Sequence, residues 1–344
     1  MLKVFFKKIV KFILVKLNLI RLFLLFAPRG RLVILNYHRI SDKKSGNSLS
    51  SFDLGVTREK FEKEMRYLNR NFSVLSFSRA IDLLKNGKDW PNFPVVISFD
   101  DGYRDFSLNA FPILEKYNLT AIVFISTKLI EDGGSFWWDE LRNLIENNSL
   151  EVIKLALENS STSVYDLDLE HLKTIQEKKA FLDKVTFEFK KIKGKHRDEL
   201  LNKLKLLLKL GKDTEREVLS WEEIRELKKA GIEFGSHSHS HYLLNLEDEK
   251  IIEEELRLSK NKLEENLKEK IDYLAYPNGL YNTRVKELVE KVGYKAACSS
   301  LYGHNTRDRD FFALKRFSLE ESQSLDDFII SLGRLFGALP FLKE

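Results

Sequence analysis

Hydrophobic residues along this chain form short runs that alternate with longer stretches in which apolar positions recur at helical spacing. The short runs are rich in β-branched residues, which is typical of strands buried on both faces of a parallel sheet. They cover residues 31–38, 72–77, 94–99, 120–126, 232–234, 271–276, 294–299 and 312–319. Helices are expected from Thr57 onward and over residues 78–84, 105–117, 220–231, 248–269, 283–292 and 326–336. The alternation predicts an α/β fold, a single (β/α) barrel, closed or incomplete, over residues 29–344.

Residues 137–215 depart from this alternation. They are rich in Leu, Lys and Glu and keep a helical period, and the stretch from Phe187 to Leu210 is especially basic and amphipathic. A helical period without strand-like runs indicates packed helices. We therefore expect an inserted helical subdomain at about 137–215, not an independent fold.

The first 28 residues combine Phe, Leu, Ile and Val with six basic residues between Lys3 and Arg21 and no acidic residue. No uncharged stretch approaches the ~18 residues of a spanning helix, and a signal peptide would carry its charges first. The pattern predicts a membrane-associating helix that lies in the interface, peripheral to the membrane on its cytoplasmic side. Two alternatives stay open: an uncleaved anchor with an extracytoplasmic barrel, and a helix docked on the barrel.

Composition and charge narrow the function classes. The chain has 344 residues, of which 43% are hydrophobic and 32% charged, so a large core in a soluble body is expected. Residues 1–41 hold nine Lys or Arg, more than the whole net charge of +5, so the remainder is mildly acidic. That distribution argues against a nucleic-acid partner. The one cysteine, Cys298, excludes an internal disulfide framework.

Two adjacent carboxylates, Asp100 and Asp101, follow the apolar run 94–99 and precede Gly102, which permits a sharp turn. Successive side chains of a strand point to opposite sides, so the two carboxylates can do different work. Burying either one is costly unless it is paired or binds a metal. The structural alternative is a turn in which Asp101 or Asp105 caps the next helix.

Three of the seven histidines, His237, His239 and His241, lie in the five-residue stretch 237–241 that follows the run 232–234. His237 and His241 are four positions apart, so a helical turn would place them on one face, with His239 pointing away. Two histidines and one carboxylate are a common ligand set for catalytic Zn²⁺ or a similar ion. The alternative is a polar loop with solvated histidines.

The motifs in this order resemble those of the NodB-type polysaccharide deacetylases, carbohydrate esterase family 4. Residues 98–102 (Ser-Phe-Asp-Asp-Gly) resemble the first motif, and residues 237–241 resemble the second, His-Ser/Thr-x-x-His. Residues 276–279 (Tyr-Pro-Asn-Gly) resemble a degenerate third motif. The resemblance covers roughly residues 31–128 and 219–320 and implies a NodB-type irregular (β/α) barrel, interrupted here by the helical insertion.

The resemblance also implies a site and a reaction. Asp101, His237 and His241 would bind a divalent metal, in the first place Zn²⁺, with Ni²⁺, Co²⁺ or Fe²⁺ as alternatives. Asp100 would be the general base that activates water. The substrate would be an N-acetylated amino sugar of a polysaccharide or lipid-linked glycan, and acetate would be released.

Residues around the third motif would contact that glycan. The substrate-binding candidates are Tyr276, Pro277 and Asn278, and a backbone N–H near them would hold the oxyanion. Trp137 and Trp138 in the insertion can stack on a sugar face, or they can pack the insertion onto the barrel.

The chain departs from the family pattern at two places. The third motif commonly carries an Arg that orients the base, and Ala275 stands there instead. The last motif commonly carries a His as general acid, and residues 314–317 here read Leu-Lys-Arg-Phe. His38, at the end of the first strand, becomes the first candidate for that catalytic role, ahead of His239 and His304.

Three functions fit these motifs. A metal-dependent N-deacetylase uses every feature named above. A deformylase acting on a lipid-linked sugar would share the chemistry and differ only in the acyl group. A catalytically impaired glycan-binding protein would have no need of the base, and the presence of Asp100 argues against it.

Overall fold

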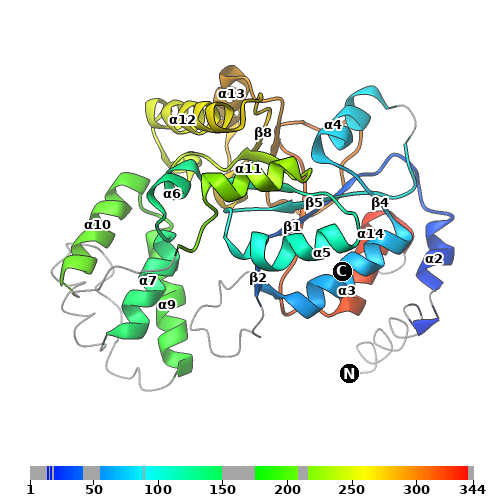
Figure 1. The fold of residues 1–344 in the computed structure, drawn as a ribbon, viewed down its shortest axis with the longest axis horizontal. Coiled ribbons are helices and arrows are strands. Elements are labelled where there is room, and N and C mark those ends of the chain that lie inside the picture. Colours follow the sequence, from blue (N-terminus) through cyan, green and yellow to red (C-terminus); the bar gives the residue numbers. More distant parts are fainter. Residues whose placement is uncertain are drawn as a thin grey trace.

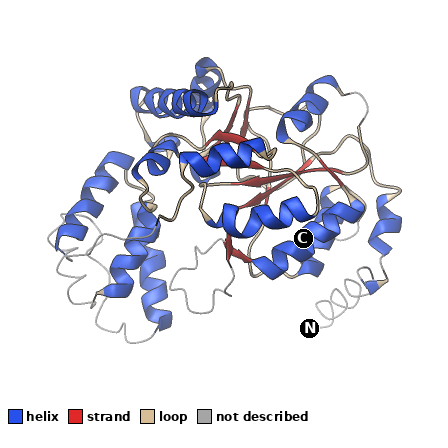
Figure 2. Ribbon diagram, in the orientation of Figure 1, coloured by secondary structure: helices blue, strands red, loops and turns tan. Residues whose placement is uncertain are grey.

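The structure is a computed structural model that describes residues 14, 16–17, 19–41, 55–87, 90–148, 175–207 and 216–339. At its centre lies a curled parallel sheet (Figure 2) with the strand order β10-β1-β5-β6-β7-β8-β9, and β4 pairs with the start of β5. The strands are β1 (Val33–Tyr37), β4 (Ser73–Val74), β5 (Pro94–Phe99), β6 (Ile122–Ile125), β7 (Glu233–Ser236), β8 (Tyr273–Ala275), β9 (Ala296–Cys298) and β10 (Phe317–Ser318).

The two edges of the sheet are linked through residues 314–318. Leu314 forms a parallel bridge with Cys298 of β9, and Phe317 of β10 pairs with Leu35 of β1. All the strand pairings along the sheet are parallel, so the strands bring their carboxyl ends to one side. The expected irregular (β/α) barrel is confirmed, and Cys298 is buried within it.

Helices cover the outside of the sheet (Figure 1). They are α3 (Arg58–Asn71), α4 (Phe77–Asn86), α5 (Phe111–Lys116), α6 (Thr127–Asp132), α11 (Trp221–Lys229), α12 (Glu249–Leu267), α13 (Thr283–Val292) and α14 (Leu325–Leu335). Thr57 caps α3 through a bond from the N–H of Lys60. Ser220 and Glu223 form the capping box expected at the start of α11.

Several element boundaries differ from the sequence-based expectation. The helix expected over 105–117 begins as a π-helix (Phe106–Ala110) and becomes α5 only at Phe111. Pro112 causes this break, because proline fits only in the first turn of an α-helix. The strand expected over 72–77 is only Ser73–Val74, because Ser76 already caps α4. The short parallel pair β2 (Arg39–Ser41) and β3 (Gly55–Thr57) was not expected.

Three described helices form the insertion, seen at the left of Figure 1: α7 (Trp137–Asn147), α9 (Ile175–Phe189) and α10 (Gly194–Leu207). They share a hydrophobic cluster of their own, which includes Leu141, Leu182 and Leu200. Trp138 packs against both this cluster and the main core of the barrel. The parts of the expected insertion at 149–174 and 208–215 lie outside the described residues.

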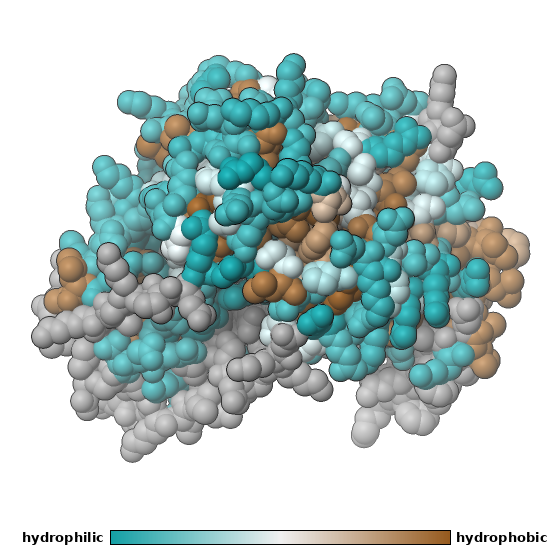
Figure 3. All heavy atoms as spheres, viewed as in Figure 1, coloured by the Kyte–Doolittle hydropathy of each residue, from teal (hydrophilic) through white to brown (hydrophobic). Residues whose placement is uncertain are grey.

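Near the N-terminus, the short helix α2 (Leu19–Leu24) has two different faces. Ile20 and Leu24 are buried in the main core, whereas Leu22 is 53% exposed, and Leu25 and Phe26, directly after the helix, are 72% and 82% exposed. Figure 3 shows hydrophobic residues gathered at this edge of the molecule. Docking on the barrel thus accounts for one face only. Within the described part of the chain, no helix has the length and apolarity to cross a bilayer. The expectation for residues 1–13 falls outside that part.

Candidate active site

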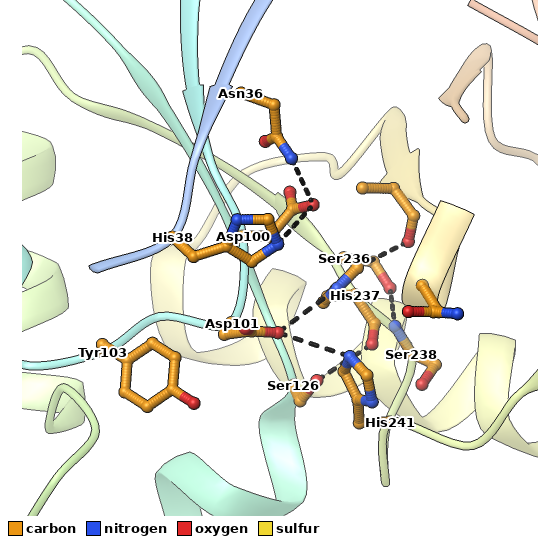
Figure 4. A network of polar contacts seen from close by, with 12 residues as sticks. Asn36, His38, Asp100, Asp101, Tyr103, Ser126, Ser236, His237, Ser238 and His241 are labelled. Carbon is orange, nitrogen blue, oxygen red and sulfur yellow. Dashed lines mark hydrogen bonds and ion pairs between the residues drawn. The ribbon is translucent and has the colours of Figure 1, made fainter. Parts of the chain in front are cut away.

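Three buried side chains converge beyond the carboxyl ends of β5 and β7 (Figure 4). Asp101 Oδ1 lies 3.4 Å from His237 Nε2 and 3.3 Å from His241 Nε2. Asp101 has a φ of 75°, in the left-handed region that non-glycine residues rarely adopt. Such strain is maintained only where the surrounding structure enforces it, often at functional sites. The structure therefore brings together the three residues that were expected from the sequence to act as metal ligands.

This set of donors fits a divalent cation. Asp101 Oδ1 is buried and has no hydrogen-bond partner among the described residues, a costly state for a carboxylate oxygen. Two ligands held at about 2.0–2.1 Å around a tetrahedral ion lie about 3.3 Å apart. Both Asp101–histidine separations match that spacing. One carboxylate and two imidazoles also leave coordination positions for water and substrate.

The two histidines reach this point from a loop, not from a helix. Ser238 and His241 have φ values of 63° and 55°, so the helical turn expected over residues 237–241 is wrong. Nδ1 of His237 lies 2.8 Å from the carbonyl oxygen of Ala275, which leaves Nε2 facing Asp101. Burial lowers the pKa of His241 to about 4, so its imidazole is neutral and can donate a lone pair to a metal.

Asp100 points to the other side of the β5 end and is held by three donor groups. The Arg316 guanidinium donates from Nη1 to Oδ1 and from Nη2 to Oδ2, both at 2.7 Å. The Asn36 amide donates to Oδ2 at 3.1 Å. Burial disfavours the charged form, but Arg316 and His237 outweigh it, and the pKa of Asp100 falls below its ordinary value. Asp100 is therefore an ionised, oriented carboxylate beside the three ligands.

Arg316 contacts the site in a way that the sequence analysis did not predict. The segment 314–317 was noted for the histidine it lacks, yet its arginine is buried and paired with Asp100. One signal was available: a buried carboxylate needs a cation, and Arg316 lies within the run 312–319 that was expected to form a strand. Arg316 thereby fills the orienting role that Ala275 cannot fill.

His38 lies at the edge of this site, where it lines the pocket above the ligands. Its Nε2 is 3.9 Å from Asp100 Oδ2, within ion-pair range. Burial lowers the pKa of His38, although the Asp101 and Asp100 carboxylates oppose the shift. His239 and His304, the weaker candidates, are not among the pocket-lining residues that the structure describes.

The pocket has one wall from the barrel and one from the insertion. On the barrel side it is lined by Asn36, His38, Arg316 and Ser318. On the insertion side it is lined by Trp137, Trp138, Arg142, Thr186 and Lys190. The two tryptophans thus both pack the insertion and face the pocket, so the two interpretations of these residues are compatible.

The three expected substrate-binding residues take different positions. Asn278 lines the pocket together with Gly279. Tyr276 is turned into the core, where its hydroxyl donates to the carbonyl of Phe312 at 2.9 Å, and neither it nor Pro277 is among the described lining residues. The N–H groups of Tyr276 and Gly279 donate to backbone carbonyls. The N–H of Asn278 is then the candidate oxyanion donor of this turn, because Pro277 has none.

Comparisons with known proteins agree with this site. The sequence matches the family model described as "Polysaccharide deacetylase" over residues 87–190 and 194–297. The YxkH protein of Bacillus subtilis is 24% identical over 310 residues, covering 90% of this chain and 76% of that protein. A Staphylococcus epidermidis protein named "Poly-beta-1,6-N-acetyl-D-glucosamine N-deacetylase" is 30% identical over 158 residues, which cover 43% of this chain and 52% of its own length.

Solved structures support the fold. The Streptococcus pyogenes deacetylase PplD, solved in complex with acetate, superposes with a TM-score of 0.61 at 18% identity and covers 88% of this chain and 98% of its own. A de-N-acetylase from Aggregatibacter actinomycetemcomitans gives a TM-score of 0.56 at 16% identity, with 88% and 99% covered. The curled parallel sheet and its surrounding helices are therefore shared with solved deacetylases.

Proposed function

The chain belongs to the polysaccharide deacetylase family, and from this premise we propose that it is a metal-dependent N-deacetylase that releases acetate from an amino sugar of a glycan. One observation carries the proposal. Asp101 Oδ1, without a hydrogen-bond partner among the described residues, faces two imidazole nitrogens, and the neighbouring Asp100 is held ionised by Arg316. A metal site and a base thus occur side by side at the bottom of one pocket.

Asp101, His237 and His241 would hold the ion. When bound, it would supply Lewis acidity toward water and toward the amide carbonyl of the substrate. Asp100 would take the proton from the attacking water, because its carboxylate is ionised and fixed by Arg316 on both oxygens. Since that pairing also makes Asp100 a weak base, its contribution depends on geometry more than on proton affinity.

Two further groups would act on the carbonyl oxygen and the leaving amine. The N–H of Asn278 would donate to the developing oxyanion from the pocket wall. His38 would return a proton to the amine, from its position 3.9 Å from Asp100. A neutral His38 can first accept the proton that Asp100 removes from water, which would complete the transfer without solvent.

For the substrate we propose a glycan containing N-acetylglucosamine. The relative from S. epidermidis is named for a poly-β-1,6-linked N-acetylglucosamine, and Trp138 offers an aromatic ring in the pocket wall on which an apolar sugar face can stack. The acyl group is taken as acetyl because that relative's name specifies it.

The direct test is to measure acetate release from β-1,6-linked N-acetylglucosamine oligosaccharides by the full chain after reconstitution with Zn²⁺, Co²⁺, Ni²⁺ or Fe²⁺. N-formylated oligosaccharides serve as the parallel substrate. We expect acetate release with at least one metal and release at least about 100-fold slower from Asp100→Asn. Preferential formate release would favour the deformylase. Glycan binding without release of either acid, with every metal, would favour the impaired binding protein and contradict the proposal.

We further propose that the N-terminal region holds the protein peripherally at an anionic, cytoplasmic membrane surface. The exposed residues Leu22, Leu25 and Phe26 lie in a 28-residue stretch that carries basic and no acidic residues. Exposed apolar side chains beside Lys and Arg favour the headgroup region of a bilayer. In Figure 1, α2 lies at the opposite end of the long axis from the insertion. Such binding would therefore leave the insertion side of the pocket away from the lipid.

A further inference from the structure

The two histidines of the proposed metal site are oriented in different ways. His237 is fixed by the contact between its Nδ1 and the carbonyl oxygen of Ala275. Nδ1 of His241 is buried and has no hydrogen-bond partner in the part of the chain that the structure describes. Metal-binding histidines usually use their second ring nitrogen in a bond that fixes the ring. For His241, packing must supply this orientation.

The packing comes from the start of helix α7 in the insertion. The Trp138 ring lies 4.8 Å from the His241 ring at 66°, and the Phe136 ring lies 5.4 Å away at 81°. Trp138 donates from Nε1 to the Tyr103 hydroxyl at 2.9 Å, and Tyr103 is two residues beyond Asp101. The start of α7 therefore contacts both loops that carry proposed ligands.

Helix α10 of the insertion contacts the loop that carries His241 at the next residue, Tyr242. The hydroxyl of Tyr242 donates to Asp198 Oδ2 at 2.8 Å. The backbone of Gly194 approaches the Tyr242 ring so closely that a Cβ there would lie 2.1 Å from it. The Gly194 N–H donates to Glu247 Oε1 at 2.7 Å. Because only glycine permits this approach, the backbone at the start of α10 packs directly against the ring of Tyr242, the residue that follows His241.

Arg197 of α10 contacts both α7 and the loop that carries His241. Its guanidinium lies 4.7 Å from the Trp137 ring centroid and 5.8 Å from that of Tyr242. The side chain is buried, and Nε and Nη1 have no hydrogen-bond partner among the described residues. Cation–π contact with both rings therefore ties α7, α10 and the His241 loop into one unit.

We propose that the helical insertion positions His241 and thereby sets the affinity of the site for its metal. Trp138 would hold the ring, and the Gly194 end of α10 would hold the adjoining backbone. The left-handed backbone of His241, with a φ of 55°, persists only if its surroundings enforce it. The inference rests on the proposed metal site and adds that a segment outside the three sequence motifs controls it.

The test is a metal titration of the full chain and its variants. Zn²⁺ affinity is measured by competition with a chromophoric chelator, and ligand geometry is followed through the Co²⁺ absorption spectrum. We expect Gly194→Ala and Trp138→Leu to bind about 10–100-fold more weakly, the usual cost of losing support around a ligand, with an altered Co²⁺ spectrum. Trp138→Phe keeps a ring against His241 and should restore most of the affinity.

Gly134→Ala is the matched control, because its Cβ would meet only Leu129 Cδ2, at 3.9 Å. It should bind metal like the wild type. Unfolding midpoints of the metal-free proteins identify any variant that does not fold, and the remaining variants then decide. If those of Gly194→Ala and Trp138→Leu that fold bind metal as tightly as the wild type, the positioning role is overturned and the proposed function stands. If the wild type binds no divalent metal, the proposed function itself fails.

Discussion

Arg316 and Asp100 form a buried, two-pronged ion pair in which each guanidinium Nη atom lies 2.7 Å from one carboxylate oxygen. The Arg316 Nε donates to the carbonyl of Ser299 at 2.9 Å, which fixes the plane of the fork. Paired, hydrogen-bonded charges of this kind are strong and geometrically specific. The pair therefore determines both where the proposed base points and that it stays ionised.

Arg316→Lys should lower kcat by about 100-fold, within the range attributed to a positioned acid or base. Lysine keeps the positive charge but cannot form the fork. Because Arg316 holds the pKa of Asp100 below its ordinary value, weakening the pair should raise that pKa. The acid limb of the pH profile of kcat/KM should then move to higher pH.

The neighbouring Lys315→Gln is the control for this substitution, since Lys315 is not among the described pocket-lining residues. Its pH profile should match that of the wild type. An Arg316→Lys enzyme with unchanged kcat and an unchanged acid limb would show that the ion pair is structural only.

Substituting a proposed metal ligand and substituting the proposed base should affect metal retention and turnover differently. His237→Ala removes a proposed ligand and should abolish retention of the metal through desalting, as measured by elemental analysis. Asp100→Asn keeps the three ligand atoms and should retain metal while turnover falls at least about 100-fold. Full turnover in Asp100→Asn would refute the assigned base.

Parts of this site follow from sequence patterns, and other parts depend on tertiary packing. The Asp pair and the histidine cluster could be found because polar residues that follow apolar runs mark the strand ends, and the family resemblance then implied Asp101, His237 and His241 as the ligand set. Their loop conformation could not, since positive φ values at Ser238 and His241 replace the expected helical turn. The sequence pattern thus indicates which residues form the site, whereas tertiary packing determines the loop conformation that brings them together.

Long-range partners are the least predictable part of the site. Arg316 and Asp100 are 216 positions apart, and they meet only because residues 314–318 bridge the sheet edges. Trp138 contacts His241 across more than a hundred residues through an insertion whose docking no short pattern encodes. The barrel itself was predictable, because strand and helix periods repeat along the whole chain.

Glu64→Gln should change how stability depends on pH. Glu64 is fully buried and accepts a hydrogen bond from the Tyr37 hydroxyl at 2.9 Å. Burial raises its pKa from the ordinary 4.5 to about 7. A folded-state pKa above the unfolded value means that stability is present below about pH 4.5 and is lost as pH rises through 7. The wild type should therefore lose on the order of 3 kcal/mol at most across this window, and Glu64→Gln should not.

Urea unfolding at pH 5 and pH 8 measures this difference. Glu62→Gln is the control, because a hydrogen bond from Lys116 lowers the pKa of the partly exposed Glu62. Its small contribution is lost only on acidification below the ordinary carboxyl pKa of 4.5, so between pH 5 and pH 8 this variant should follow the wild type. Equal pH dependence in Glu64→Gln and the wild type would mean that Glu64 is ionised when folded.

Membrane attachment through α2 should depend on its exposed face and on salt. Leu25→Glu with Phe26→Glu places two acids where the side chains are 72% and 82% exposed, so the fold should be kept while binding to vesicles that contain anionic lipid is lost. Deleting residues 1–28 is a poorer test, because it also removes the buried Leu24 from the core. Leu206→Glu, at an equally exposed site on α10 (80%), is the matched control and should bind like the wild type.

Raised salt should weaken wild-type flotation, since part of the attraction is electrostatic. Flotation of the double variant at the wild-type level would exclude this face as the contact, and protease access to the barrel in intact cells would refute its cytoplasmic placement.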